Sequence, residues 1–383
     1  MMHAPHTFGV AFLTVDWRPW TADWALVPFH FWSLVFFVFG CIVGSFLNVC
    51  IYRLPRGMSI VMPPSHCPHC QYAIPWYLNV PLVTWLALRG RCKNCGAPIS
   101  PRYFIVELLT GAAFLSCWLA FGGTSAVIAI IYAIFLAGLI VATFIDFEHF
   151  IIPDEITYGG MAVGLVASFL FPALHDVHTL TAGMWQSVLG LCAGAGIIYA
   201  ILRLGKLLFG RQRLKLPLDT KIVFTETSVR LPDREIPYEE LFYRQSDVIT
   251  LRARTVELVD RGYQDVRVRL ALRSGWLEIG GDRMNPADVP FLEAVSAEIV
   301  LPREAMGLGD VKFMGAIGAF IGWPGVLFSL MLSSMIGAAA GITLIALRRR
   351  EWSSRMPYGP YIALAAAIWI LGGKKIVRAI FAM

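Results

Sequence analysis

The sequence predicts a polytopic α-helical membrane protein, an all-α bundle of about eight transmembrane helices that carries a small soluble insertion. Of the 383 residues, 57% are hydrophobic and only 15% are charged, whereas soluble domains carry about 25% charged residues. The charges are also concentrated, because residues 203–303 hold 17 Lys or Arg and 15 Asp or Glu. The formal net charge of +6 therefore reflects membrane topology and gives no reason to expect nucleic-acid binding.

Eight apolar segments approach the roughly 20 residues that a transmembrane helix needs. They are residues 28–50, 103–121, 125–145, 155–173, 183–203, 308–323, 325–346 and 358–373. Several are separated by turns of only a few residues, so we expect antiparallel neighbours in one bundle. Residues 1–27 lack the basic stretch of a cleaved signal peptide, so they are predicted to be a short N-terminal tail.

Basic residues predict which ends of these spans face the cytoplasm. Residues 51–102 hold six Lys or Arg and no Asp or Glu, which is typical of a cytoplasmic loop. Alternation then puts residues 146–154, 204–307 and 347–357 on the same side. The C-terminal Lys374, Lys375 and Arg378 are the exception, because eight spans leave them outside. Either this tail is an interfacial helix, or the number of spans differs by one.

The predicted organisation places two polar regions between groups of spans. It comprises the tail (1–27), the first span (28–50), a cytoplasmic cysteine loop (51–102), spans two to five (103–203), an insertion (204–303) and spans six to eight (304–383). In the insertion, "KIVFTETSVRL", "DVITLRARTVELV" and "DVRVRLALRSGWLEIG" alternate apolar and polar residues, the period of half-buried strands. We therefore expect a small antiparallel β-domain without a catalytic motif, whose partner is unknown.

Four of the eight cysteines follow a C-x2-C-x21-C-x2-C pattern, formed by Cys67, Cys70, Cys92 and Cys95. The others lie in apolar spans, where cysteine is usually a small hydrophobic residue. Two pairs of thiolates on tight turns close a tetrahedral Zn²⁺ site with Zn–S distances of about 2.3 Å. The alternative is a pair of disulfides, but thiols stay reduced in the cytoplasm. We favour a structural zinc site, with His69 as a bystander.

Asp146 and Asp310 are the strongest catalytic candidates. Asp146 ends the third span and Asp310 begins the sixth, so alternation brings both carboxyl groups to the cytoplasmic side of the membrane. Ionisable groups at membrane depth are functional candidates. Two carboxyls in a partly dehydrated site share a proton, as in aspartic proteases, where one Asp activates water and the other protonates the carbonyl oxygen or the leaving amine.

Residues around this pair have supporting or purely structural interpretations. Gly307 and Gly309, just before Asp310, would let an extended substrate backbone approach closely. Lys312 and the helix N-terminus favour a charged Asp310, so we expect Asp310 to be the base and Asp146 the acid. Asp154 is interpreted as the N-cap of the fourth span, and Asp310 itself has the simpler interpretation of a favourable anion at a helix N-terminus.

Six blocks of the sequence match a known family in that family's order. They are "GSFLNVCIYRLP" (44–55), the four cysteines, "PRYFIVELLT" (101–110), "FIDFEHFIIPDEIT" (144–157), "MGLGDVKFMGAIGAFIGW" (306–323) and "PYGP" (357–360). The chain resembles bacterial type IV prepilin leader peptidases, which are membrane aspartic proteases of the GxGD type. The resemblance implies that Asp146 and Asp310 are the catalytic pair.

The resemblance also implies a location, substrates and a cofactor. Family members lie in the bacterial inner membrane and cut the short basic leader from prepilins or pseudopilins on the cytoplasmic side, after a glycine. Many then methylate the new N-terminus with S-adenosylmethionine, and a cysteine loop accompanies this bifunctional form. The sequence has no visible S-adenosylmethionine motif, so that site would be built from residues 44–107 and neighbouring spans. Typical members have a short connection where this chain has residues 204–303.

Three other functions are weighed against a prepilin peptidase. Presenilin-like proteases share the GxGD motif, but "PAL" at residues 172–174 precedes that motif here instead of following it. A membrane methyltransferase without protease activity would leave the Asp pair unused. A non-enzymatic scaffold of a pilus or secretion machine would use the β-rich insertion as its contact surface. Substitution of either Asp by Asn separates these functions.

Overall fold

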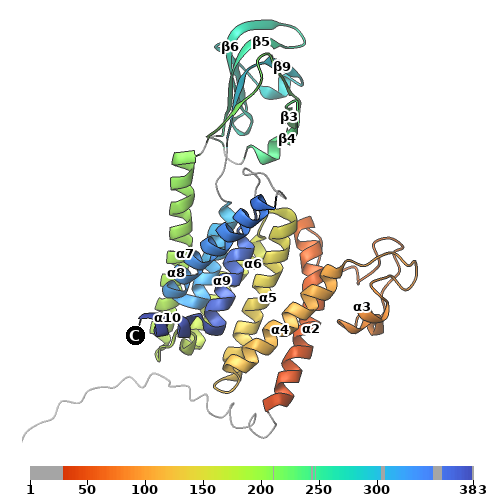
Figure 1. The fold of residues 1–383 in the computed structure, drawn as a ribbon, viewed down its shortest axis with the longest axis vertical. Helices are drawn as coiled ribbons and strands as arrows, with labels where there is room; N and C mark the ends of the chain where they lie inside the picture. The colour runs from red at the N-terminus through yellow and green to blue at the C-terminus, as the bar shows by residue number, and fades with distance from the viewer. Residues whose placement is uncertain are drawn as a thin grey trace, which may run out of the picture. The chain divides into compact units, whose positions relative to one another are not determined.

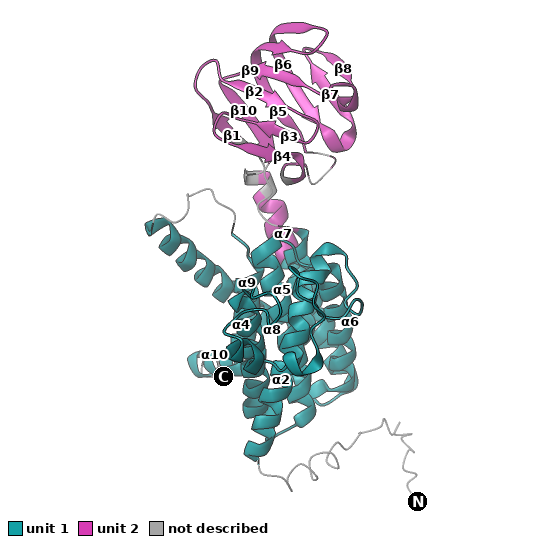
Figure 2. Ribbon diagram, turned by 90° about the vertical axis from the view of Figure 1, so that its right-hand side faces the viewer, with its two compact units in different colours: residues 1–197, 308–383 teal, residues 198–307 magenta. Residues whose placement is uncertain are grey.

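The computed structural model describes residues 29–209, 211–242, 245, 247–302, 307–347 and 356–381. The expected N-terminal tail (1–27) lies outside the described residues, as does the arginine run 348–350. The chain divides into two compact units, one formed by residues 1–197 and 308–383 and the other by residues 198–307 (Figure 2).

The first unit is a bundle of helices (Figure 1). Its long helices are α2 (Phe29–Arg53), α4 (Pro101–Phe121), α5 (Ala126–His149), α6 (Asp154–Leu170), α7 (Leu180–Phe209), α8 (Leu308–Ala346), α9 (Gly359–Ile368) and α10 (Lys374–Phe381), with α7 continuing into the second unit. Among the described residues, six helical segments are long and apolar enough to cross a membrane. They are Phe29–Arg56, Pro101–Phe121, Ala126–His149, Leu180–Gly205, Leu308–Ala346 and Gly359–Val377. The expected helical membrane architecture is therefore confirmed.

The number of spans depends on α6 and α8. Helix α6 has 17 residues, slightly fewer than the roughly 20 that a span needs. Helix α8 is interrupted at Gly322, whose φ of 69° and ψ of 174° are not helical, and Pro324 follows two residues later. The break separates the expected spans 308–323 and 325–346.

Side chains from three segments stabilise the break in α8. The hydroxyl of Ser187 donates a hydrogen bond of 2.7 Å to the carbonyl oxygen of Ala319. The hydroxyl of Ser168 donates a second one, of 3.1 Å, to the same oxygen. The Nε2 atom of His175, in the short helix η4 (Pro172–His175), lies 2.9 Å from the Ser168 hydroxyl. An interrupted helix leaves carbonyls without intrahelical donors. The hydroxyls of Ser168 and Ser187 donate to such a carbonyl, and His175 contacts the first of them.

Close packing of small residues joins α7 to the first half of α8. A Cβ atom built on Gly190 would lie 2.0 Å from the carbonyl oxygen of Gly318, and one on Gly194 would lie 2.3 Å from that of Met314. Small residues let helix backbones approach closely inside membranes. Glycine is therefore required at these contacts.

The start of α10 lies near the connection between α6 and α7. The Lys374 ammonium donates hydrogen bonds to the carbonyl oxygen of Leu174 at 3.2 Å and to the carboxylate of Asp176 at 3.1 Å. The basic C-terminal segment is thus at the same end of the helical unit as η4.

The described part of the second unit is an antiparallel β-domain of ten strands. The strands are β1 (Arg211–Lys215), β2 (Lys221–Phe224), β3 (Ser228–Arg230), β4 (Glu235–Pro237), β5 (Ile249–Glu257), β6 (Gly262–Ala271), β7 (Trp276–Ile279), β8 (Asp282–Met284), β9 (Leu292–Val295) and β10 (Glu298–Pro302). Strands β9 and β10 both pair with β5, through Val295↔Thr255 and Ile299↔Leu251, so they act as one strand interrupted between them. The expected antiparallel sheet is confirmed, and the three alternating stretches form β2, β3, β5, β6 and β7. Strands β1, β4, β8, β9 and β10 were not predicted.

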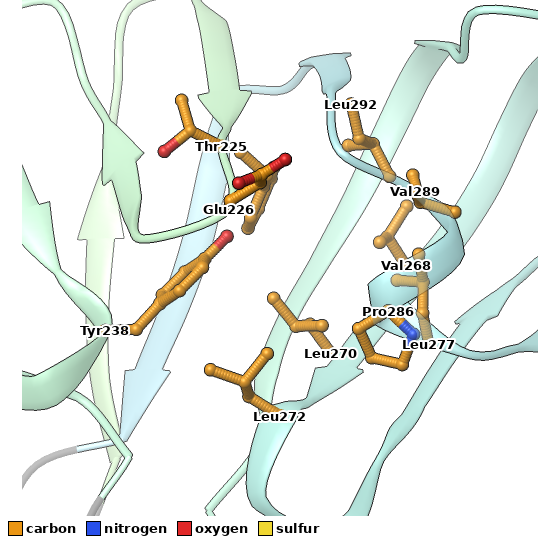
Figure 3. A pocket seen from close by; sticks show the side chains of 11 residues that line it. Thr225, Glu226, Tyr238, Val268, Leu270, Leu272, Leu277, Pro286, Val289 and Leu292 are labelled. Atoms are coloured by element: carbon orange, nitrogen blue, oxygen red, sulfur yellow. The ribbon is translucent and has the colours of Figure 1, made fainter.

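Burial alternates along the strands and creates a core under the sheet. In β5, Leu251, Ala253 and Val256 are buried while Arg252 and Arg254 face solvent. A cavity of about 40 Å³ opens beside this core (Figure 3). It is lined by Phe224, Thr225, Glu226, Tyr238, Val268, Leu270, Leu272, Leu277, Pro286, Val289 and Leu292. That volume holds a few water molecules and is too small for a peptide substrate.

Candidate active site and cysteine cluster

Asp146 lies in the last turn of α5 and is only 6% exposed. Its carboxylate accepts a hydrogen bond of 3.0 Å from the backbone N–H of Gly359, the first residue of α9. The helix ends at Phe150, whose left-handed conformation (φ 55°) lets its N–H return to the Asp146 carbonyl. The candidate acid is therefore held between the end of one helix and the start of another.

Asp310 lies in the first turn of α8, immediately after Gly309. The side chain of Ile152 connects it to the surroundings of Asp146. A Cβ atom built on Gly309 would lie 3.5 Å from Ile152 Cβ, and one on Gly359 would lie 3.2 Å from Ile152 Cδ1. Ile152 thus lies beside both Gly309, which precedes Asp310, and Gly359, whose N–H binds Asp146. The two helix ends that carry the acids therefore share Ile152 as a neighbour.

The residues around Asp310 differ partly from expectation. Gly307 is exposed, and a Cβ atom on Gly309 would make only ordinary van der Waals contacts, which agrees with an open approach to the turn. The Lys312 ammonium forms an ion pair of 2.6 Å with Asp154 and lies 4.9 Å from the centre of the Tyr158 ring. Lys312 therefore links the starts of α8 and α6.

The interpretation of Asp154 as an N-cap is wrong. The N-cap of α6 is Pro153, whose ψ of 143° starts the helix, and Asp154 is the first helical residue. Its side chain pairs with Lys312. A carboxylate in the first turn is still favourable there because the helix dipole is positive at that end.

A second ion pair near Asp146 was not foreseen from the sequence. Arg102, in the first turn of α4, donates a hydrogen bond to Glu148, in the last turn of α5. The side chain of Arg102 is 17% exposed and that of Glu148 is 38% exposed. The start of α4, where the cysteine loop ends, is thereby joined to the helix that carries Asp146.

The four cysteines of the predicted zinc site lie together. The sulfur atoms of Cys67, Cys70, Cys92 and Cys95 are all within 4.8 Å of one another, and those of Cys67 and Cys95 are 3.9 Å apart. All four thiols are free. A tetrahedron with Zn–S bonds of about 2.3 Å has sulfur atoms roughly 3.8 Å apart, so the geometry fits a four-coordinate metal without an open position.

The two halves of the cluster repeat the same turn. In each, the residue after the second cysteine donates its N–H to the carbonyl of the first, from Gln71 to Cys67 and from Gly96 to Cys92, both at 2.9 Å. This residue is left-handed in both turns, with φ of 57° at Gln71 and 71° at Gly96. The repeat explains how two short C-x2-C segments present four sulfur atoms to one point.

The electrostatics of the cluster favour a bound cation. The side-chain amide of Asn94 lowers the pKa of Cys70 to about 6, and the backbone N–H groups of Cys95 and Asn94 lower that of Cys92. At Cys95 the backbone N–H of Ala97 acts in the same direction, but burial and the three neighbouring thiols outweigh it and raise the pKa to about 11. Four thiolates repel one another without a metal, and a divalent cation removes that repulsion.

A buried polar group marks the region expected to bind the methyl donor. In the part of residues 44–107 that the structure describes, the Oδ1 atom of Asn48 is buried without a hydrogen-bond partner. The Nδ2 atom of the same side chain donates a hydrogen bond of 3.0 Å to the carbonyl oxygen of Tyr103. Nearby, Glu107 is 8% exposed and accepts a hydrogen bond of 2.8 Å from the N–H of Leu82. An unsatisfied acceptor fits a ligand with an N–H donor, such as the amino group of S-adenosylmethionine.

Two family profiles match the chain. The bacterial peptidase A24 N-terminal domain matches residues 38–121, which include the cysteine cluster. The type IV leader peptidase family matches residues 133–214 and 287–342, which include Asp146 and Asp310. The second match is interrupted within the β-domain, in agreement with an insertion there.

Curated relatives carry consistent names. A prepilin leader peptidase/N-methyltransferase of Aeromonas hydrophila is 28% identical over 92% of this chain and 94% of its own length. One of Myxococcus xanthus is 47% identical over 36% of this chain and 40% of its own. A type 4 prepilin-like proteins leader peptide-processing enzyme of Escherichia coli is 41% identical over 34% of this chain and 54% of its own. No solved structure matches.

The fold and these sites define an α-helical membrane protein with acid-bearing helix ends and a four-cysteine cluster. Within that class, the chain belongs to the type IV prepilin leader peptidase/N-methyltransferase family, as its motifs predicted.

Proposed function

We propose that this protein cleaves the leader peptide of type IV prepilins or pseudopilins and then N-methylates the new N-terminus. The observation that carries the peptidase proposal is the position of Asp146, buried against Gly359 beside the Ile152 side chain that also reaches the GxGD turn. A relative that is aligned over 92% of this chain and 94% of its own length is named for both activities.

In the proposed peptide cleavage, Asp146 and Asp310 act as a pair that shares one proton. Asp310 takes a proton from water, whose oxygen attacks the carbonyl carbon of the scissile bond, while Asp146 gives its proton to the carbonyl oxygen. As the carbon–nitrogen bond breaks, Asp310 passes the proton taken from water to the departing amine nitrogen, and Asp146 takes back a proton from a hydroxyl of the tetrahedral intermediate as the new carboxyl group forms. Gly307 and Gly309 leave room for the extended substrate, and Lys312 holds the start of α8 against α6.

The proposed topology has eight spans and a cytoplasmic active site in the bacterial inner membrane. The contact of Lys374 with Leu174 and Asp176 supports it, since eight spans put the C-terminal segment and the connection between α6 and α7 on the same, outer side. The cytoplasmic assignment itself rests on the basic, acid-free residues 51–102.

For methylation, we propose that Cys67, Cys70, Cys92 and Cys95 hold a structural zinc ion that orders the loop between α2 and α4. S-adenosylmethionine would supply the methyl group. Asn48 is the residue proposed to accept a hydrogen bond from it, because its buried oxygen has no partner among the described residues.

Mass spectrometry of a co-expressed prepilin tests both activities together. The wild-type protein is expected to yield a mature chain cut after a glycine and carrying one N-methyl group. Asp146→Asn and Asp310→Asn are each expected to leave the leader attached in protein that folds normally. Unchanged cleavage by either variant would overturn the peptidase proposal and favour a methyltransferase or a scaffold.

A further inference from the structure

Residues 76–88 form an uncharged apolar stretch, "WYLNVPLVTWLAL", inside the cysteine loop. It holds the short helices η3 (Trp76–Leu78) and α3 (Val83–Ala87). Trp76 is 84% exposed, Val83 61% and Leu86 58%, and Val83 and Leu86 share one face of α3 because they are three residues apart. So much exposed apolar surface in a short segment marks an interaction surface.

The opposite side of the segment contacts α4. The N–H of Leu82 donates to the Glu107 carboxylate at 2.8 Å. The Trp85 ring lies 5.3 Å from that of Phe104, and its indole N–H donates to the Ile99 carbonyl. The segment therefore has one side in contact with a candidate transmembrane helix and one apolar side that is mostly exposed in the described structure.

The contact with Glu107 places the segment at membrane depth. Glu107 is six residues beyond Pro101, the first residue of α4, so it lies about 9 Å along the helix axis. On the same part of α4, Ile105 is 49% exposed and Leu108 is 41% exposed, as expected for side chains that face lipid. Backbone donors at this depth need a partner inside the protein. Glu107 provides it for Leu82.

The charges around the segment match an anionic membrane surface. Residues 51–102 contain no Asp or Glu, and Arg89, Arg91 and Lys93 follow the apolar stretch directly. The Lys93 ammonium lies 5.6 Å from the centre of the Tyr77 ring. Trp and Tyr beside basic residues are typical of segments at the membrane–water interface.

We propose that residues 76–88 insert into the bilayer leaflet next to the cysteine cluster, with Arg89, Arg91 and Lys93 at its anionic headgroups. A lipid surface explains the depth along α4, the apolar exposed face and the lack of acidic residues together. The proposal concerns how the cysteine loop is anchored, and it stands or falls independently of peptidase or methyltransferase activity.

Photocrosslinking in reconstituted full-length protein tests this insertion. p-Benzoylphenylalanine is introduced at Val83 or Leu86, and at Val259 as a control, because Val259 is 82% exposed in the β-domain. The variants are irradiated in vesicles of phosphatidylethanolamine and phosphatidylglycerol and analysed by mass spectrometry. We expect phospholipid adducts at residues 83 and 86 and none at 259. Each variant is first checked for a monodisperse size-exclusion profile.

Two outcomes would overturn the proposal. One is the absence of phospholipid adducts at residues 83 and 86 in folded variants. The other is crosslinking of these positions to a co-reconstituted prepilin in place of lipid, which would make the face a substrate-docking surface. The headgroup contact is tested with a triple variant that combines Arg89→Gln, Arg91→Gln and Lys93→Gln. Without the substitutions, phosphatidylglycerol is expected to be enriched over phosphatidylethanolamine among the adducts, and the triple variant is expected to lose this enrichment. An enrichment that persists in the variant would contradict the proposed contact of the three basic residues with anionic headgroups.

Discussion

The carboxylate of Asp146 accepts a hydrogen bond from the backbone N–H of Gly359, a residue 213 positions away in the sequence. This contact joins the end of α5 to the start of α9 at the candidate active site. A Cβ atom on Gly359 would lie 2.7 Å from the Asp146 carboxylate oxygen. Position 359 therefore controls where the candidate acid is held, which explains a glycine in the "PYGP" block.

Gly359→Ala is expected to lower the rate of leader cleavage roughly 100-fold, because the added methyl group displaces the Asp146 carboxylate and a displacement of about 1 Å has effects of this size. The rate is measured on a reconstituted prepilin. Gly138→Ala is the matched control, since it lies in α5 and its Cβ would meet nothing within 4 Å. Equal rates for the two variants would show that the hydrogen bond does not position the acid.

Asp154→Asn is expected to reduce leader cleavage by no more than a few-fold, in contrast to Asp146→Asn. Asp154 is paired with Lys312 and its side chain is 59% exposed, and exposed ion pairs contribute roughly 0–1 kcal/mol. A double-mutant cycle with Lys312→Met, read by thermal unfolding in detergent, measures the pair. Loss of cleavage in folded Asp154→Asn would assign a catalytic role to Asp154.

Cys67→Ser is expected to remove the bound zinc, because three thiolates with a hydroxyl bind Zn²⁺ far more weakly than four thiolates. Metal content is measured by mass spectrometry of the purified protein, and N-methylation is measured on a peptide that has already lost its leader. Cys117→Ser is the control, since Cys117 is fully buried within α4 and distant in sequence from the cluster. Full zinc occupancy in Cys67→Ser would contradict the four-cysteine site.

Stability is expected to fall as the pH drops below 6.5 because of His175. Burial, followed by the charge of Lys374, lowers the pKa of His175 from 6.5 to about 4, although Asp176 acts in the opposite direction. The folded protein therefore keeps this histidine neutral where the unfolded chain protonates it. The resulting stability is complete above pH 6.5 and is lost between pH 6.5 and about 4, by on the order of 1 kcal/mol per pH unit.

His175→Gln keeps a donor for Ser168 but cannot be protonated. We expect this variant to be less stable than the wild type at pH 7 and to lose less stability between pH 7 and pH 5. Thermal unfolding at several pH values gives both slopes. Identical slopes would assign the acid sensitivity to other groups.

Gly190→Ala is expected to destabilise the helical unit by roughly 1–3 kcal/mol or to prevent folding, because overpacking at a close helix contact forces the backbones apart. Its Cβ would lie 2.0 Å from the Gly318 carbonyl oxygen, whereas one on Gly196, in the same helix, would meet nothing within 4 Å. Thermal unfolding of Gly190→Ala and Gly196→Ala gives the difference. A destabilised Gly196→Ala with an unaffected Gly190→Ala would contradict the packing of α7 on α8.

Local patterns in the sequence determined the membrane class, the antiparallel β-insertion, the four-cysteine cluster and the two candidate acids. Each follows from residue type and short-range spacing: apolar segments of span length, alternation in strands, and cysteines separated by two residues. The match of the motif order with a peptidase family was also visible at this level.

Only the tertiary structure revealed which distant residues contact these groups. Gly359 lies at Asp146, Lys312 pairs with Asp154, and Glu107 holds Leu82. The sequence of one helix does not determine which distant residues will contact it. These contacts depend on how the helices pack and on which buried donors and acceptors need a partner. The expected cap at Asp154 was wrong because the helix begins one residue earlier, after Pro153, and the Asp154 carboxylate pairs with Lys312 of a remote helix.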